Sequence, residues 1–148
     1  MFIVEPGIIL LAQAGASCFM AGLIWFVQLV HYPAYHFVGK AEFRRYQMHH
    51  QRAVSWVVGP TMLGELATAI ALVIWPVPGM DDAWAWAGLG ILGLVWASTA
   101  FWQVPLHTKL LASGTPAAID RLVHSNWVRT VGWTARAVLS LAMLNKMA

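Results

Sequence analysis

The chain has 148 residues, of which 59% are hydrophobic and only 10% charged, whereas a soluble domain carries about 25% charged residues. So little charge excludes an ordinary soluble domain and indicates that the chain lies in a bilayer. The net charge is +3 with nine Lys and Arg, which is too few for a nucleic-acid interface, so we expect no nucleic-acid partner. The single cysteine, Cys18, excludes an intrachain disulfide.

Four apolar segments follow one another along the chain, and each is long enough, or nearly so, to supply the roughly 20 residues that a membrane-spanning helix needs. They cover residues 7–32, 53–75, 83–106 and 126–144. Helical segments at 42–52 and 117–125 lead into the second and fourth spans without a breaker, so we expect these two helices to be long. The sequence therefore predicts an all-α integral membrane four-helix bundle, formed as a single domain by residues 1–148.

Basic residues are concentrated in the two connections that join spans one to two and three to four: Lys40, Arg44, Arg45, Arg52, Lys109 and Arg121. The opposite side holds Lys146 together with Glu5, Asp81 and Asp82. By the positive-inside rule, both long connections are cytoplasmic and both termini lie on the non-cytoplasmic side. Tryptophans mark both interfaces, as in an aromatic belt: Trp75, Trp84 and Trp86 on the outer side, and Trp56, Trp102 and Trp127 on the inner side.

A short internal repeat relates the two halves of the chain. The segment Phe26-Val-Gln28, followed by His31, is echoed by Phe101-Trp-Gln103, followed by His107. Ser55-Trp-Val57 is similarly echoed by Asn126-Trp-Val128, and Glu65 and Arg136 then fall at the same offset. Two similar hairpins related by an axis along the membrane normal would produce this pattern, and chance similarity is the competing explanation.

The histidines form the first layer of candidate functional residues, since all six lie at cytoplasmic helix ends or in the cytoplasmic connections: His31, His36, His49, His50, His107 and His124. They are either ordinary interface residues, or several converge at the mouth of the bundle as an acid–base group or as metal ligands. No recognised ligand spacing is present, so the sequence predicts no metal site and leaves any cofactor open.

A second layer lies just inside the membrane. Gln28, Gln103 and Arg129 are polar at a depth where lipid-facing positions rarely are, so they should point inward. Trp25, Trp96 and Trp133 lie slightly deeper and either line a flat aromatic pocket or simply pack the core. Together with His124, these residues are the candidate substrate-binding set.

Glu65 and Arg136 form the third layer, near the membrane centre. A charge at that depth costs at least about 2.5–3.5 kcal/mol, and pairing with an opposite charge offsets this cost. We therefore predict that the two residues face the interior as a buried ion pair, which either fixes the register of the helices or forms a substrate or proton site.

Two stretches carry a family resemblance: Trp25-Phe-Val-Gln-Leu-Val-His-Tyr-Pro33 and Asn126-Trp-Val-Arg-Thr-Val-Gly-Trp-Thr-Ala-Arg136. With the order of the other features, they resemble small four-span proteins of bacterial inner membranes that are distantly similar to the anthrone oxygenase-like family. The resemblance implies oxidation of a polycyclic phenol by dioxygen without an evident metal. It would need a base, for which His31, His50 and His107 are the candidates, and a pocket in which Arg129 holds the oxyanion.

Three functions of different classes fit the sequence. The first is a membrane oxidoreductase or oxygenase that acts on a hydrophobic aromatic compound. The second is a non-catalytic subunit of a larger respiratory or photosynthetic assembly, and the third is a ligand-binding or transporter-like bundle that would need to form homo-oligomers for transport. Besides lipid, the expected partners are accordingly a hydrophobic small molecule, further copies of the chain or a larger complex.

Overall fold

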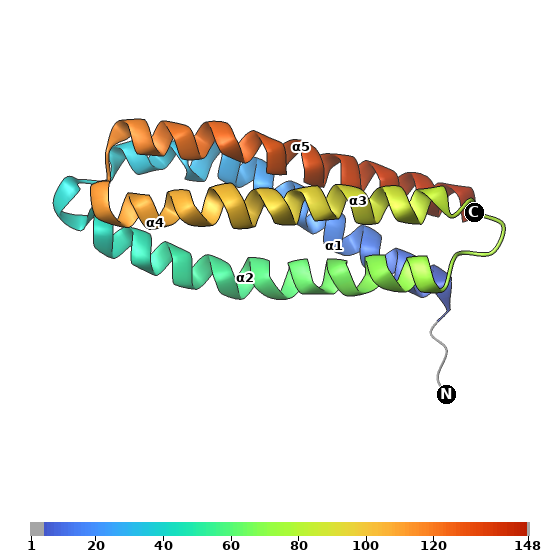
Figure 1. The fold of residues 1–148 in the computed structure, drawn as a ribbon. Helices are drawn as coiled ribbons and strands as arrows, with labels where there is room; N and C mark the ends of the chain where they lie inside the picture. Colours follow the sequence, from blue (N-terminus) through green and yellow to red (C-terminus); the bar gives the residue numbers. More distant parts are fainter. Residues whose placement is uncertain (1–4, 148) are drawn as a thin grey trace.

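The computed structural model describes residues 5–147, which form four long antiparallel helical rods (Figure 1). The first rod consists of α1 (Pro6–Phe26), the π-helix η1 (Val27–His31) and the 3₁₀ helix η2 (Pro33–Phe37). The second is α2 (Lys40–Ile74), and the third consists of α3 (Ala83–Ser98), the π-helix η3 (Thr99–Gln103) and α4 (Val104–Ser113). The fourth is α5 (Pro116–Met147). No strand occurs among the described residues, so the predicted all-α class is confirmed.

Three of the rods are long and apolar enough to cross a membrane: Pro6–Phe37, Lys40–Ile74 and Ala83–Ser113. The predicted fourth span lies within α5, which does not meet the same criterion. Its buried face is polar, with Asn126, Arg129 and Arg136 turned toward the other helices. Its outer face is apolar, with Val131 and Leu141 exposed. The average over α5 therefore understates how apolar its outward surface is.

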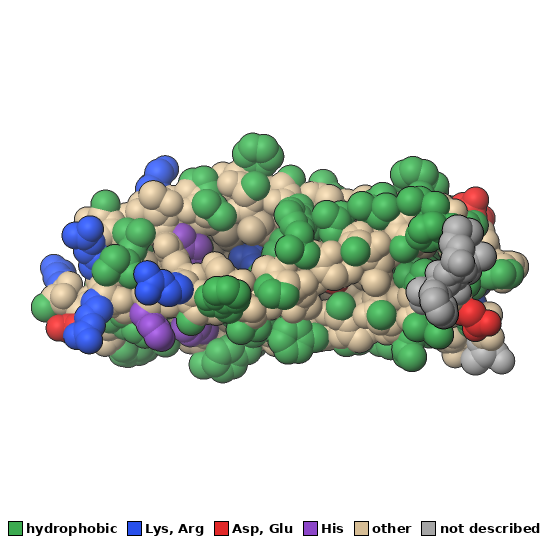
Figure 2. All heavy atoms as spheres, turned by 90° about the horizontal axis from the view of Figure 1, so that it is seen from below, with side chains coloured by type: hydrophobic (Ala, Val, Ile, Leu, Met, Phe, Trp, Pro, Cys, Tyr) green, Lys and Arg blue, Asp and Glu red, His purple; other side chains and the backbone are tan. Residues whose placement is uncertain are grey.

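The second and fourth rods are long, as predicted: α2 has 35 residues and α5 has 32. At about 1.5 Å per residue, each spans about 50 Å, which exceeds a hydrocarbon core of about 30 Å. The two ends of the described chain lie at the same end of the bundle, where the side chain of Met147 approaches Gly7 (Figure 1). Most Lys and Arg side chains gather at the opposite end (Figure 2).

Both π-helices follow from a proline placed after them. The ring of a helical proline clashes with the carbonyl four residues earlier and supplies no N–H, so the preceding turn widens. Pro33 follows η1 and Pro105 follows η3, each two residues beyond its last residue. Each π-helix contains the glutamine of one copy of the sequence repeat, Gln28 in η1 and Gln103 in η3. Such single-turn π segments are frequent at functional sites.

The centre of the bundle is packed closely around α5. A Cβ on Gly132 of α5 would meet Val95 Cγ2 of α3 at 2.4 Å, so only glycine allows this approach. Gly114, with φ of 53°, ends α4 in the left-handed conformation that glycine adopts without strain. A Cβ there would also press on the ring of Phe43 at 3.0 Å. These contacts fix how the helices that carry the polar layers face one another.

Candidate functional site

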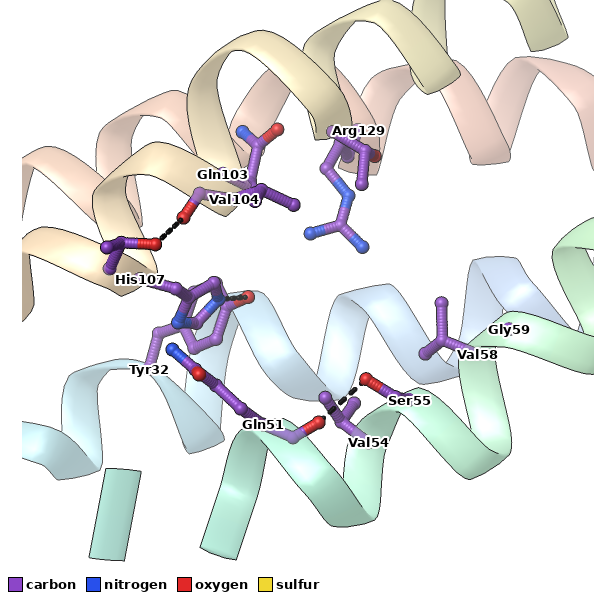
Figure 3. A pocket seen from close by; sticks show the side chains of 12 residues that line it. Tyr32, Gln51, Val54, Ser55, Val58, Gly59, Gln103, Val104, His107 and Arg129 are labelled. Atoms are coloured by element: carbon purple, nitrogen blue, oxygen red, sulfur yellow. Dashed lines mark hydrogen bonds between the residues drawn. The ribbon is translucent and has the colours of Figure 1, made fainter. Parts of the chain in front are cut away.

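A cavity of about 350 Å³ lies between α2 and the η3–α4 segment, in the half of the bundle that carries the basic residues. Val54, Val58 and Gly59 give apolar surface on the α2 side, and Val104 lies on the opposite side of the cavity (Figure 3). Tyr32, Gln51, Ser55, Thr99, Gln103, His107, Thr108 and Arg129 complete the lining. The surface is hollowed on this side of the molecule, and histidine and basic side chains are visible within the hollow (Figure 2). The cavity thus opens sideways between two helices.

Arg129 supplies the positive charge of the cavity. Its side chain is 6% exposed, and its guanidinium points from α5 into the space above α2 (Figure 3). Nη1 donates a 3.3 Å hydrogen bond to Asn126 Oδ1, and the guanidinium carbon lies 5.1 Å from the centre of the Trp133 ring. Within residues 5–147, the ion pairs are His36 with Asp120 and Arg136 with Glu65, so no carboxylate pairs with Arg129. Its Nε is buried without a hydrogen-bond partner.

The histidines on three helical rods converge beside the cavity. His31 Nε2 and His50 Nδ1 are 2.8 Å apart, and the ring centres of His50 and His107 are 5.7 Å apart. The prediction that at least two of these histidines approach one another is therefore confirmed. Only His107 lines the cavity, and it holds both of its ring nitrogens in hydrogen bonds, to Tyr32 at 3.0 Å and to Gln47 at 2.7 Å. His31 and His50 form a second row behind it.

A bond between two imidazoles limits their charge. Each ring nitrogen in the His31–His50 bond must either donate or accept, so at least one of the two rings is not doubly protonated. Since His50 is also buried, this row is a neutral or singly charged pair. No group of three His, Cys, Asp or Glu side chains in the described part of the chain is arranged to hold a metal ion.

The two glutamines of the repeat fasten the π-helices to α5. Gln28 Nε2 donates to the carbonyl of Val123 at 3.1 Å, and its Oε1 accepts from Asn126 at 2.9 Å. Gln103 Nε2 donates to the carbonyl of Ser125 at 3.1 Å. Both amides point inward, as the sequence predicted for this layer. Only Gln103 also lines the cavity, so Gln28 braces α5 rather than contacting a ligand.

Glu65 and Arg136 are buried together deeper in the bundle, with Arg136 Nη2 3.7 Å from Glu65 Oε1. Glu65 also accepts hydrogen bonds from Ser17 at 2.6 Å and from Trp133 Nε1 at 2.7 Å. Arg136 Nη1 donates to the carbonyl of Gly88 at 2.7 Å. The carboxylate of this layer is therefore well paired, whereas Arg136 Nε and Nη2 have no hydrogen-bond partner among the described residues. Trp133 links this layer to the cavity layer, because its ring lies beside Arg129.

Two predicted pocket residues lie elsewhere. Trp25 is 40% exposed, donates to Thr134 Oγ1 and packs edge-to-face on Trp127, so it lies on the outer surface and not in the expected inner aromatic pocket. His124 is exposed and bonds to the carbonyl of Asp120 on its own helix, so it does not join the other histidines. In both cases the side chain points to the outer face of its helix. Trp96 is half-buried against the core, and Trp133 is fully buried; neither lines the cavity.

Several residues of the site were missed from the sequence. Tyr32 and Gln47 both bond to His107, and Gln13 bonds to Ser17 next to Glu65. The signal for Gln13 and Ser17 was available, because two polar residues four apart in an uncharged span share one face. Gln47 lies three residues before His50 on α2 and so shares its face in the same way.

Comparisons of the chain with protein families, with curated proteins and with solved structures found no match.

Proposed function

We propose that this chain is a small membrane oxidoreductase that holds a hydrophobic ring compound as its anion beside Arg129 and promotes its oxidation by dioxygen. The observation that carries the proposal is a buried arginine that lines a cavity and has no carboxylate partner among the described residues. An arginine scarcely loses its proton. A buried charge of this kind calls for a counter-ion. An anionic ligand in the cavity would supply it.

The rest of the lining supports a ligand that combines apolar surface with a polar group. Valine side chains supply the apolar surface, while polar residues on both sides share the lining with the guanidinium: Gln51 and Ser55 of α2, and Tyr32, His107 and Gln103. Hydrogen-bond donors that are already in place around a developing negative charge stabilise it most in a site of low dielectric. The arrangement favours the ionised form of a weakly acidic ring compound, such as a phenol or an anthrone.

The setting that we propose is a four-span bundle in a bacterial inner membrane, with the termini on the non-cytoplasmic side. Large aromatic residues at two levels of the surface support it: Trp56 is 78% and Trp102 52% exposed at the level of the cavity, and Trp75 is 54% and Trp86 60% exposed near the other end. Trp56 and Trp75 are separated by about 28 Å at 1.5 Å per residue, close to the thickness of a hydrocarbon core. The cavity then opens at the inner interface, where an amphipathic ligand partitions.

The reaction class comes from the resemblance of the sequence to anthrone oxygenase-like proteins. An anthrone loses a proton from its central ring to give an enolate, and that anion reacts with dioxygen to yield an anthraquinone and water. The contribution of the protein is to bind the anion and so raise the fraction of substrate that is ionised. Of the three candidate bases, His107 lines the cavity with both ring nitrogens in hydrogen bonds and His31 and His50 lie behind it, so the proposed role of the protein is to bind the anion.

The test is oxygen uptake and anthraquinone formation from anthrone by the purified protein in lipid nanodiscs, compared with empty nanodiscs. We expect a protein-dependent rate that falls about ten- to a hundredfold in Arg129→Met, the effect of losing one charge-assisted interaction. Arg121→Met, on an exposed position of α5, is the matched control and should retain the wild-type rate.

The same experiment distinguishes the alternatives. Binding of ring compounds without oxygen uptake would identify a ligand-binding bundle instead of an enzyme. If neither occurs, the proposal is wrong and the accessory-subunit hypothesis gains support, since nothing would then occupy the cavity of the isolated chain.

A further inference from the structure

The two hydrogen bonds of His107 share one donor-to-acceptor order. Gln47 Nε2 lies 2.7 Å from His107 Nδ1, and an amide nitrogen can only donate. With the amide in this orientation Nδ1 accepts, which leaves it without a proton. A neutral imidazole then carries its proton on Nε2, the atom that faces the Tyr32 hydroxyl at 3.0 Å. Gln47 thus donates to His107, and His107 donates to Tyr32.

The same donor-to-acceptor order extends to the Tyr32 hydroxyl, which lines the cavity. The Tyr32 oxygen accepts the bond from His107, so its own hydrogen remains to be donated. Tyr32 lines the cavity and is 3% exposed, and its hydroxyl is hydrogen-bonded to His107. Figure 3 shows the Tyr32 ring beside His107, on the side of the cavity toward which the Arg129 guanidinium extends. The buried chain therefore ends in a donor at the wall of the cavity.

The supports of this chain are rigid. Gln47 is fully buried on α2, and Tyr32 follows the π-helix η1 directly. Tyr35 makes five edge-on or tilted aromatic contacts, with His31, Tyr32, Phe43, Tyr46 and His50, and these hold the same segment against α2. The position of the Tyr32 oxygen is fixed by this packing, and its role as donor follows from the bond that it accepts from His107.

We infer that Tyr32 is a specificity-determining residue, which donates a hydrogen bond to an acceptor oxygen on the ring compound held beside Arg129, and that Gln47 and His107 are the positioning residues that fix this polarity. The inference rests on the proposed function in that it takes the same cavity as the ligand site. The ligand class is thereby narrowed to ring compounds whose oxygen accepts without donating: a phenolate, an enolate or a ring ketone.

Two neutral probes test the donor without involving charge. 2-Acetylnaphthalene carries an acceptor oxygen, and 2-ethylnaphthalene has nearly the same shape without it. Their dissociation constants are measured by quenching of tryptophan fluorescence in nanodiscs, and the ratio of the two constants isolates the hydrogen bond. We expect the wild type to prefer the ketone, and Tyr32→Phe to reduce that preference about three- to tenfold while leaving 2-ethylnaphthalene unaffected.

Tyr35→Phe is the matched control. Tyr35 is equally buried and lies three residues further on, but it does not line the cavity and its hydroxyl has no partner. The variant should keep the wild-type ratio. Nitrogen-15 NMR of the histidine-labelled wild type tests the polarity directly and needs no variant. His107 should carry its proton on Nε2.

The outcomes are distinct. A ratio unchanged in Tyr32→Phe, or a His107 proton on Nδ1, overturns this inference and leaves the proposed function standing. Failure of the wild type to bind either naphthalene overturns the proposed ligand site and the role of Tyr32 together.

Discussion

Arg129 and Arg136 lie seven residues apart on α5, so they share one helix face at two depths, yet their surroundings differ in kind. Arg136 faces Glu65 and donates to the carbonyl of Gly88, inside a layer where Ser17 and Trp133 also bond to the carboxylate. Arg129 has Asn126 and the face of Trp133 around it, and a cavity in front of it. A buried charge with a carboxylate partner fixes the bundle, whereas a buried charge beside a cavity, without such a partner among the described residues, is available for a ligand.

The largest expected effect comes from removing the carboxylate of the Glu65–Arg136 ion pair. Glu65→Gln leaves Arg136 buried without a counter-ion, and we expect the free energy of unfolding in detergent to fall by about 3 kcal/mol. Glu65→Gln combined with Arg136→Met should recover part of this loss, because no buried charge then remains. A double variant that is no more stable than the single one would show that the pair does not act as a pair.

The opposite result is expected in the cavity layer. Arg129→Met removes a charge that has no carboxylate partner, so stability should change by less than about 1 kcal/mol, in the direction of a gain. The measurement is again the free energy of unfolding in detergent. A loss as large as that in Glu65→Gln would mean that Arg129 is structural and that the contrast between the two layers is false.

Gly88 packs directly against the guanidinium of Arg136. A Cβ at this position would lie 2.9 Å from Arg136 Nη1 and 3.4 Å from Leu139 Cδ2. Gly88→Ala should therefore displace the guanidinium and cost about 1–3 kcal/mol, as overpacking does. Gly90→Ala on the same helix is the control, because a Cβ there meets nothing within 4 Å, and it should be neutral or slightly stabilising. Equal effects of the two alanines would argue against close packing at Arg136.

The smallest effect is expected at Trp25. Replacing it by Phe removes the bond to Thr134 on the outer surface of the bundle, so stability should fall by at most about 1 kcal/mol. Binding of ring compounds, followed by fluorescence quenching, should not change. A marked loss of binding would show that Trp25 contributes to the ligand site.

The sequence predicted the depth of the polar layers well, because counting at a fixed rise per residue requires no knowledge of the neighbours. It thereby brought His31, His50 and His107 to one level and placed Glu65 opposite Arg136. The direction around the helix axis was harder to predict. A π turn contains an additional residue relative to an α turn, so residues beyond η1 and η3 are rotated relative to those before them.

Trp25 and His124 were misplaced for a different reason, because Trp25 precedes η1 and α5, which carries His124, contains no π turn. Both were assigned to the interior from depth and residue type alone, and both point outward. The cavity itself was not predictable, since it arises from the separation of α2 and α4, which depends on packing along the whole bundle. Tyr32 and Gln47 belong to the site because of that packing. A tyrosine at an interface and a glutamine in an amphipathic helix are otherwise unremarkable residues.

The most direct test of the contrast between the two arginines is the selectivity of the cavity for an anion. Dissociation constants are measured in nanodiscs for 2-naphthoate and for 2-naphthamide, which differ in charge and little in shape. The wild type should bind the carboxylate about ten- to a hundredfold more tightly than the amide, and Arg129→Met should abolish that preference while Arg121→Met keeps it. Equal preference for the anion in the wild type and in Arg129→Met would contradict the claim that Arg129 is the counter-ion of a bound ligand.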